Sequence, residues 1–167
     1  MATTFTTPAR PLTFLITGGS SGFGLSLTRL AQAGGHRVIA TSRNPSKTPE
    51  LVKEIESKGG KLLTLDVNDL NSTKFVQQLE ASGTQIDVLV NNAGYSVYAP
   101  VETGTEEEYR TQAETLYFGP LRLIRAVLPY QRQRRFGVIA NMSTGAALEG
   151  NPSMGLYAGP KAGVDGE

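Results

Sequence analysis

Two side chains near the end of the chain have the spacing that acid–base chemistry requires. Tyr157 and Lys161 are four residues apart, so they share one face if this segment is a helix. A lysine ammonium beside a phenol favours the phenolate, and such a phenol can exchange a proton with an alcohol oxygen. Ser143 follows an apolar run and is positioned to hydrogen-bond the same oxygen. A Tyr-x-x-x-Lys pair is also common by chance, so the prediction depends on motifs elsewhere in the chain.

A glycine-rich stretch near the start of the chain provides that support. Between the apolar run 12–16 and a helical pattern from residue 25 onward, the chain reads Thr17-Gly18-Gly19-Ser20-Ser21-Gly22-Phe23-Gly24. Glycines permit positive φ angles and a close approach of backbone to ligand, and a helix N-terminus suits a pyrophosphate. A tight strand–helix turn that binds nothing is the alternative. The order strand, glycine turn, helix favours a dinucleotide site.

The loop after the second apolar run bears on the choice of cofactor. Val38-Ile39-Ala40 leads into Thr41, Ser42 and Arg43, with no acidic residue among them. In a nucleotide-binding fold an acid here bonds a ribose 2′-hydroxyl, whereas an arginine favours a 2′-phosphate. We therefore predict NADP (NADPH) rather than NAD, the alternative being a solvent-exposed loop arginine.

Strands and helices are predicted to alternate along the chain. The expected strands are 12–16, 38–40, 61–67, 86–90 and 136–142; the expected helices are 22–33, 50–58, 70–82, 106–128 (interrupted at Gly119-Pro120 and ended by Pro129) and 156–167. This alternation predicts an α/β fold with a doubly wound parallel sheet in three α/β/α layers. The candidate residues follow strands, so we expect them together at the carboxyl edge of the sheet.

Composition excludes several other classes of protein. The 167 residues carry a net charge of +1, no cysteine and a single histidine, which argues against a nucleic-acid partner, a disulfide framework and a metal site. No apolar run approaches the roughly 20 residues of a membrane helix. We expect a cytoplasmic protein with a loose leader over residues 1–11, containing Pro8 and Pro11, and one domain over 12–167.

Thr105 is expected to cap a helix, and Arg132, Arg134 and Arg135 to be solvated charges at a helix end.

Taken together, these motifs resemble those of the short-chain dehydrogenase/reductase family. The matching pieces are Thr17-Gly18-xxx-Gly22-x-Gly24, Asp66-Val67, Asn91-Asn92-Ala93-Gly94, Ser143 and Tyr157-x-x-x-Lys161. The resemblance implies a Rossmann-type sheet and hydride exchange between a nicotinamide and a carbonyl/alcohol pair. It implies Asp66 at the adenine and Asn92 beside the nicotinamide ribose, with Val67, Ala93 and Gly94 completing the cofactor surface. Tyr157 would be the general acid/base, Lys161 would bind the nicotinamide ribose and tune Tyr157, and Ser143 would orient the carbonyl.

Three features depart from the family pattern. Leu116 occupies the slot of an asparagine that normally helps to hold a water in the proton relay. Pro160 directly precedes Lys161, which is tolerable near a helix start. The chain also stops at Glu167, so it resembles a C-terminally truncated member that lacks the usual last strands. The fifth strand would then be an exposed edge, and we expect a homo-oligomer or a partner that covers it.

Three functions remain open at this point. The first is an NADP-dependent oxidoreductase of small carbonyl or alcohol substrates, with specialised metabolism as its expected setting. The second is a non-redox isomerase, cyclase or lyase on the same scaffold, suggested by Leu116 and the incomplete cleft. The third is a non-catalytic interaction protein. Tyr95, Tyr98 and Met154 indicate an apolar pocket rim but do not identify the substrate.

Overall fold

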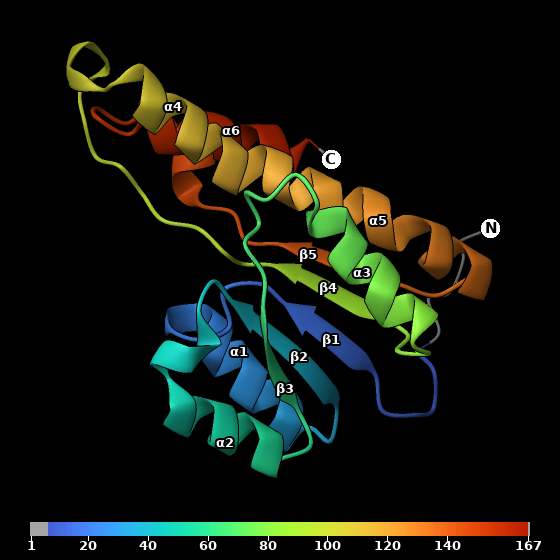
Figure 1. Cartoon of the computed structure of the whole chain (residues 1–167). Helices are drawn as coiled ribbons and strands as arrows, with labels where there is room; N and C mark the ends of the chain where they lie inside the picture. The colour runs from blue at the N-terminus through green and yellow to red at the C-terminus, as the bar shows by residue number, and fades with distance from the viewer. Residues whose placement is uncertain (1–6, 167) are drawn as a thin grey trace.

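Five short apolar segments form one parallel sheet in the computed structural model, which describes residues 7–166 (Figure 1). The sheet has the order β3-β2-β1-β4-β5, and Leu15 of β1 pairs with Ile39 of β2 and Leu89 of β4. The order turns back beside β1, where doubly wound sheets open a ligand crevice outside the carboxyl ends of their strands. The strands are β1 (Thr13–Ile16), β2 (Arg37–Ser42), β3 (Lys61–Thr64), β4 (Val88–Asn91) and β5 (Val138–Asn141).

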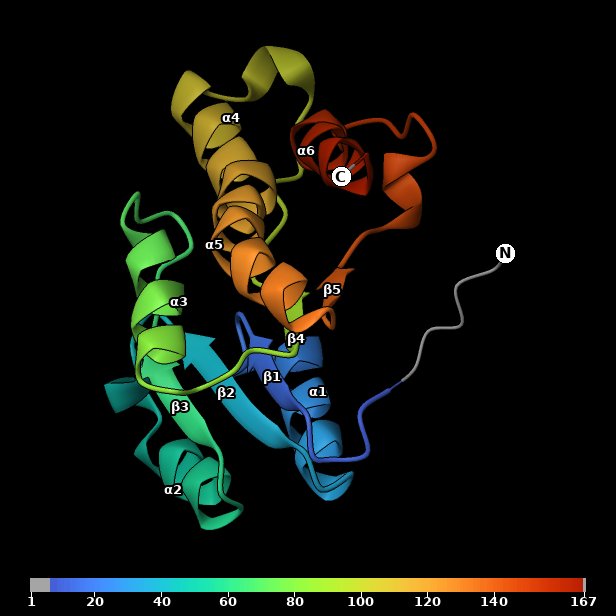
Figure 2. The same cartoon turned by 90° about the vertical axis from the view of Figure 1, so that its right-hand side faces the viewer.

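Helices cover both faces of this sheet (Figure 2). One face carries α1 (Gly22–Ala33) and α2 (Pro49–Ser57), and the other carries α3 (Ser72–Ala81) and α5 (Gly119–Arg134). The helix α4 (Glu106–Ala113) leads into α5 through the turn η3 (Glu114–Phe118), and α6 (Gly155–Asp165) packs against α4 and η3. Short 3-10 turns are η1 (Pro45–Lys47), η2 (Val101–Thr103) and η4 (Gly145–Ala147). The predicted three-layer, Rossmann-type fold is confirmed.

Alternate strand residues point to opposite faces, so the sheet has two hydrophobic cores. Leu15 and Leu89 pack with Val127 of α5 on one face, while Ile16 packs with Ile55 of α2 on the other. All of these side chains are almost completely buried. Because both faces are covered, the strands read as nearly continuous apolar runs. This packing fixes the strand ends and therefore the loops that line the site.

The long helical segment differs from the sequence prediction. The predicted interruption at Gly119-Pro120 is wrong, because the helix changes to a π-helical turn at η3 and Pro120 stands in the first turn of α5. Pro120 lacks one N–H donor, but the helix stays continuous there because the π-helical turn before it bonds Gly119 N–H to the Glu114 carbonyl. The predicted end at Pro129 is also wrong: α5 continues to Arg134, and its buried Gln131 donates hydrogen bonds to the carbonyls of Ile86 and Asp87. Tertiary contacts thus outweigh the local cost of that proline.

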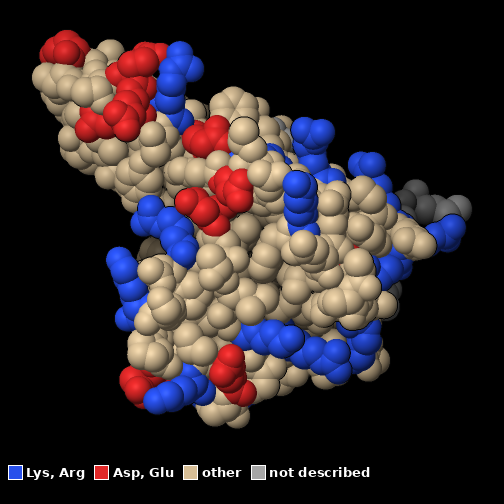
Figure 3. Space-filling view, in the orientation of Figure 1, with Lys and Arg blue, Asp and Glu red and all other residues tan. Residues whose placement is uncertain are grey.

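Predictions for two helix ends, the start of α4 and the end of α5, can be compared with the structure. Thr105 caps α4 in a reciprocal capping box with Glu108, as predicted, and acidic side chains gather at this end of α4 on the face in Figure 3. The prediction of solvated arginines is wrong for Arg134. Its guanidinium forms an ion pair with the nearly buried Glu80 at 2.7 Å and donates to the Ile86 carbonyl at 3.0 Å.

The predicted leader lies partly outside the described residues, which begin at residue 7. Just before β1, Arg10 makes two 2.8 Å hydrogen bonds to the carboxylate of Asp87, and Thr13 N–H donates to the same group at 2.9 Å. Burial acts to raise the pKa of Asp87, but the bonds from Arg10 and Thr13 outweigh it, so the pKa lies below its ordinary value.

Over residues 7–166, no helix combines the length and apolar character that crossing a membrane demands.

Candidate active site

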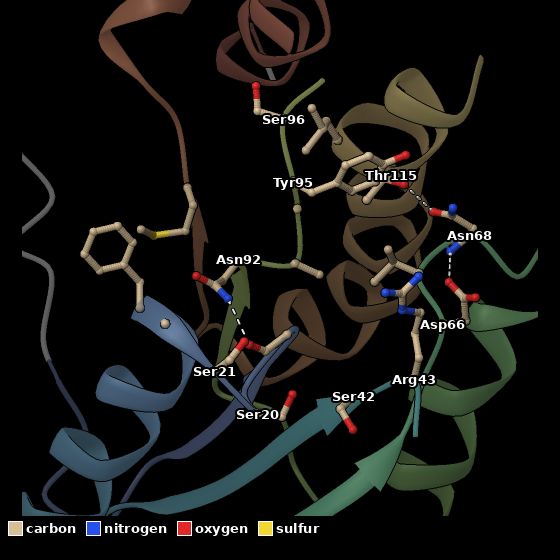
Figure 4. A pocket seen from close by; sticks show the side chains of 18 of the residues that line it. Ser20, Ser21, Ser42, Arg43, Asp66, Asn68, Asn92, Tyr95, Ser96 and Thr115 are labelled. Carbon is tan, nitrogen blue, oxygen red and sulfur yellow. Dashed lines mark hydrogen bonds between the residues drawn. The ribbon is translucent and has the colours of Figure 1, made fainter. Parts of the chain in front are cut away.

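A cavity of about 670 Å³ opens along the carboxyl ends of the strands (Figure 4). It brings together nearly all of the predicted site residues from segments far apart in the chain. Those that line it are Gly18, Ser20, Ser21, Gly22, Phe23, Ser42, Arg43, Asp66, Val67, Asn92, Ala93, Gly94, Ser143, Tyr157 and Lys161. Gly24 does not line it: this residue is buried under the turn, where a Cβ would collide with the Gly18 carbonyl.

The glycine turn forms an open cradle at the start of α1. Gly18 and Gly22 have positive φ angles of 65° and 51°. A Cβ added at Gly22 would meet no atom within 4 Å, so the space above it is free. The first turn of α1 contains no acidic residue, and no side chain caps it. Its N–H groups and the positive end of its dipole therefore face the cavity without a competing anion, as a diphosphate requires.

Hydrogen bonds join this turn to the end of β4. The Thr17 hydroxyl oxygen accepts bonds from the backbone N–H of Asn92 at 3.0 Å and of Ala93 at 2.9 Å. The Asn92 side-chain amide donates to the Thr17 carbonyl at 2.8 Å and more weakly to that of Gly18. Thr17 and Asn92 thus hold two loops of the cavity wall in register, a role for both residues that sequence reasoning missed.

The opposite end of the cavity carries Ser42, Arg43 and Asp66, the residues that bear on recognition of a ribose 2′-phosphate. Ser42 Oγ is buried and has no hydrogen-bond partner among the described residues, and Arg43 is exposed with no ion pair among them. Asp66 accepts a bond from Asn68 N–H at 2.9 Å, and Asn68 Oδ1 accepts one from the Thr115 hydroxyl at 2.9 Å (Figure 4). An exposed guanidinium without an ion-pair partner is a suitable donor for a phosphate.

Tyr157 and Lys161 lie on α6 and face the cavity from its other wall. The Lys161 ammonium lies 5.9 Å from the centre of the Tyr157 ring and donates a hydrogen bond to the Met142 carbonyl. Burial lowers the pKa of Lys161, whose residue is 6% exposed, and the nearby Asp165 carboxylate opposes that shift. The Tyr157 hydroxyl makes no hydrogen bond to any described residue, which leaves it available to a ligand.

Ser143 has a partner that the sequence analysis did not consider. Its hydroxyl donates to Asp165 Oδ2 at 2.6 Å, from the loop after β5 to the last turn of α6. Asp165 stands four residues beyond Lys161, as Lys161 stands four beyond Tyr157. That repeated spacing is the signal that would have placed Asp165 on the active face of the helix.

Leu116 and Pro160, the two unusual residues, both lie within helical segments beside the site. Leu116 is 1% exposed, belongs to the π-helical turn η3, and packs so tightly under Gly94 that a Cβ there would lie 2.8 Å from it. It therefore contributes an apolar surface to the cavity. Pro160 lies inside α6, which begins at Gly155, yet Lys161 still reaches the cavity.

The segment between β4 and α4 forms the rim near these catalytic candidates. Tyr95 lines the cavity, whereas Tyr98 and Met154, which were expected at the rim, do not. The fully buried Gln112 accepts from Val97 N–H at 3.3 Å and donates to the Tyr95 carbonyl at 3.2 Å. This buried amide, also missed from the sequence, fixes the path of the rim.

Comparison with known proteins gives consistent matches. A family described as short chain dehydrogenase matches residues 12–166. The chain is 39% identical over 158 residues to "Oxidoreductase claN" of Passalora fulva, covering 92% of this chain and 71% of that protein. It is 37% identical to a 3-ketodihydrosphingosine reductase of Bacteroides thetaiotaomicron, covering 94% of this chain and 56% of that protein. A solved metagenomic short-chain oxidoreductase in complex with NADP superposes with a TM-score of 0.86 at 27% identity, covering 93% of this chain and 72% of that one.

Proposed function

The chain belongs to the short chain dehydrogenase family, and from this premise we propose that it is an NADP-dependent oxidoreductase that interconverts a carbonyl and an alcohol on a small molecule. The observation that carries the proposal is the shared cavity. One wall is the uncapped helix start with its glycine turn, and the other holds Ser143, Tyr157 and Lys161. A cofactor cradle and an acid–base group that face one space are what a dehydrogenase requires.

The residues of the cavity fit a nicotinamide dinucleotide. The turn at Gly18 and Gly22 leaves free space for a diphosphate in front of the first N–H groups of α1. At the adenosine end, the exposed Arg43 guanidinium, which has no ion pair among the described residues, would hold a 2′-phosphate, and this supports NADP over NAD. The metagenomic relative solved with NADP is consistent with this preference. When bound, the reduced cofactor supplies the hydride.

The chain's own residues then supply the proton and the orientation. In the reducing direction, Tyr157 gives its phenolic proton to the carbonyl oxygen while Ser143 donates a hydrogen bond to that oxygen. The charge of Lys161 stabilises the phenolate left on Tyr157. In the oxidising direction, the phenolate takes the alcohol proton back. Leu116 adds an apolar side chain to the cavity wall beside Gly94, and an apolar surrounding strengthens such electrostatic interactions.

The substrate end of the cavity favours a mostly apolar carbonyl compound. Tyr95, Leu116 and Met142 line it together with the smaller Ser96 and Thr111. One relative is named as the reductase of a keto compound, 3-ketodihydrosphingosine. We take a ketone with apolar substituents as the substrate class for this chain.

The test is whether product formation needs the cofactor. Purified protein is incubated with cyclohexanone and NADPH, NADH or neither, and NADPH consumption is compared with cyclohexanol formation. We expect equal amounts of both, with NADPH strongly preferred. Products that form from carbonyl compounds without any cofactor would show non-redox chemistry instead, and no binding of either cofactor at millimolar concentration would overturn the proposal.

A further inference from the structure

Two hydrogen bonds connect the active face of α6 to the loop after β5. Lys161 donates to the Met142 carbonyl, and the next residue, Ser143, donates to Asp165 at 2.6 Å. Lys161 and Asp165 are one helical turn apart, so neighbouring residues of the loop bind neighbouring turns of the helix. The distance from Ser143 to Asp165 is typical of a hydroxyl bonded to an ionised carboxylate.

A serine hydroxyl carries one proton, and here that proton is committed. The Ser143 oxygen keeps its lone pairs, so it can still accept a hydrogen bond from a ligand. An alcohol gives its own proton to the Tyr157 phenolate, so its oxygen must also accept the hydrogen bond from Ser143. A carbonyl oxygen has no proton to donate, so either substrate takes its reactive position only after Ser143 turns its proton away from Asp165.

We propose that Asp165 is a positioning residue that holds the Ser143 hydroxyl proton in the ligand-free site, so that either substrate must displace the carboxylate to receive the hydrogen bond from Ser143. This inference rests on the proposed oxidoreductase function and adds to it a residue that sets the affinity for both substrates. Asp165 is exposed, so water solvates its carboxylate once the serine has turned. The displacement therefore has a modest cost.

Removal of the carboxylate has a kinetic signature that a damaged site lacks. In Asp165→Ala the serine is free to donate, so the KM for the carbonyl falls about three- to tenfold while kcat of reduction changes little. The equilibrium constant of the reaction is unchanged, so kcat/KM of alcohol oxidation must rise by the same factor. Since the alcohol also had to displace the carboxylate, that rise comes as an equal fall in the KM for the alcohol, with kcat of oxidation little changed.

The experiment measures cyclohexanone reduction and cyclohexanol oxidation by the wild type, Asp165→Ala, Ser143→Ala and the double variant. Glu149→Ala, an exposed acid that does not line the cavity, is the matched control and should behave as wild type. We expect the three- to tenfold fall in carbonyl KM for Asp165→Ala and no further change when it is added to Ser143→Ala. NADPH affinity should be the same in the wild type and Asp165→Ala.

An unchanged or raised carbonyl KM in Asp165→Ala, or an equal effect of that change in the Ser143→Ala background, would overturn the inference. A second readout needs no turnover: thermal unfolding of the same four proteins without cofactor. We expect non-additive melting shifts, with a coupling of about 2–4 °C between Ser143 and Asp165. Wild-type protein that binds neither cofactor would refute the proposed function alone; additive melting shifts would refute the Asp165 inference.

Discussion

An alanine at Gly22 separates the role of the glycine turn in folding from its role in binding. Gly22 has a φ of 51°, and a Cβ there would meet no atom within 4 Å, so the only structural cost is the left-handed backbone. That cost is about 1–2 kcal/mol, or about 2–8 °C in melting temperature. If a diphosphate occupies the free space, the new methyl group also removes at least one charged hydrogen bond, worth about 1.5–3 kcal/mol. We therefore expect the Kd for NADPH to rise at least about tenfold.

Gly35 provides the matched control at the other end of α1. Its φ is 78°, and a Cβ there also meets nothing within 4 Å, but it does not line the cavity. Gly35→Ala should lose similar stability with no change in NADPH affinity. Calorimetric melting and NADPH titration of both variants and the wild type provide the two numbers. Equal Kd values for Gly22→Ala and Gly35→Ala would refute the reasoning that the cofactor lies over the turn.

Three further predictions concern other parts of the molecule. Arg43→Ala should raise the Kd for NADPH at least about tenfold and leave that for NADH unchanged, by titration, with the exposed Arg37→Ala as control. Arg10→Ala should destabilise the fold by about 1 kcal/mol near pH 7 in urea melts. Because the pKa of Asp87 is depressed in the fold, its contribution is present above the ordinary value near pH 4 and is lost as the pH falls through the depressed pKa, so the difference in stability between the two proteins should shrink on acidification below about pH 4. The β5 strand pairs only with β4 in the described sheet, so we expect self-association, and a monodisperse monomer in sedimentation would contradict it.

The parts of the site that sequence reasoning found are those whose requirements are local. The positive φ angles at Gly18 and Gly22 are properties of single residues, and glycine is the residue that adopts them without strain. Similarly, alternating strands and helices predict that the loops at Arg43 and Ser143 reach the same edge of the sheet. These features were readable because each depends on residue type and order alone.

The features that sequence reasoning missed depend on partners far apart in the chain. The Ser143–Asp165 bond spans 22 residues, and the bond between Thr17 and Asn92 N–H spans 75. The spacing of Asp165 from Lys161 places it on the active face of the helix but does not identify Ser143 as its partner, and no local pattern links Thr17 to Asn92. The course of α5 through Pro129 has the same origin, because its buried face and the bonds of Gln131 decide where the helix ends.

The central claim is that Tyr157 transfers the proton in an NADPH-dependent reaction, and Tyr157→Phe tests it most directly. The change removes one hydroxyl that has no hydrogen-bond partner among the described residues, so the fold should be unaffected. NADPH-dependent reduction of cyclohexanone should fall by at least about 100-fold, while the Kd for NADPH changes by less than about threefold. Reduction at the wild-type rate by a folded, NADPH-binding Tyr157→Phe protein would contradict the account.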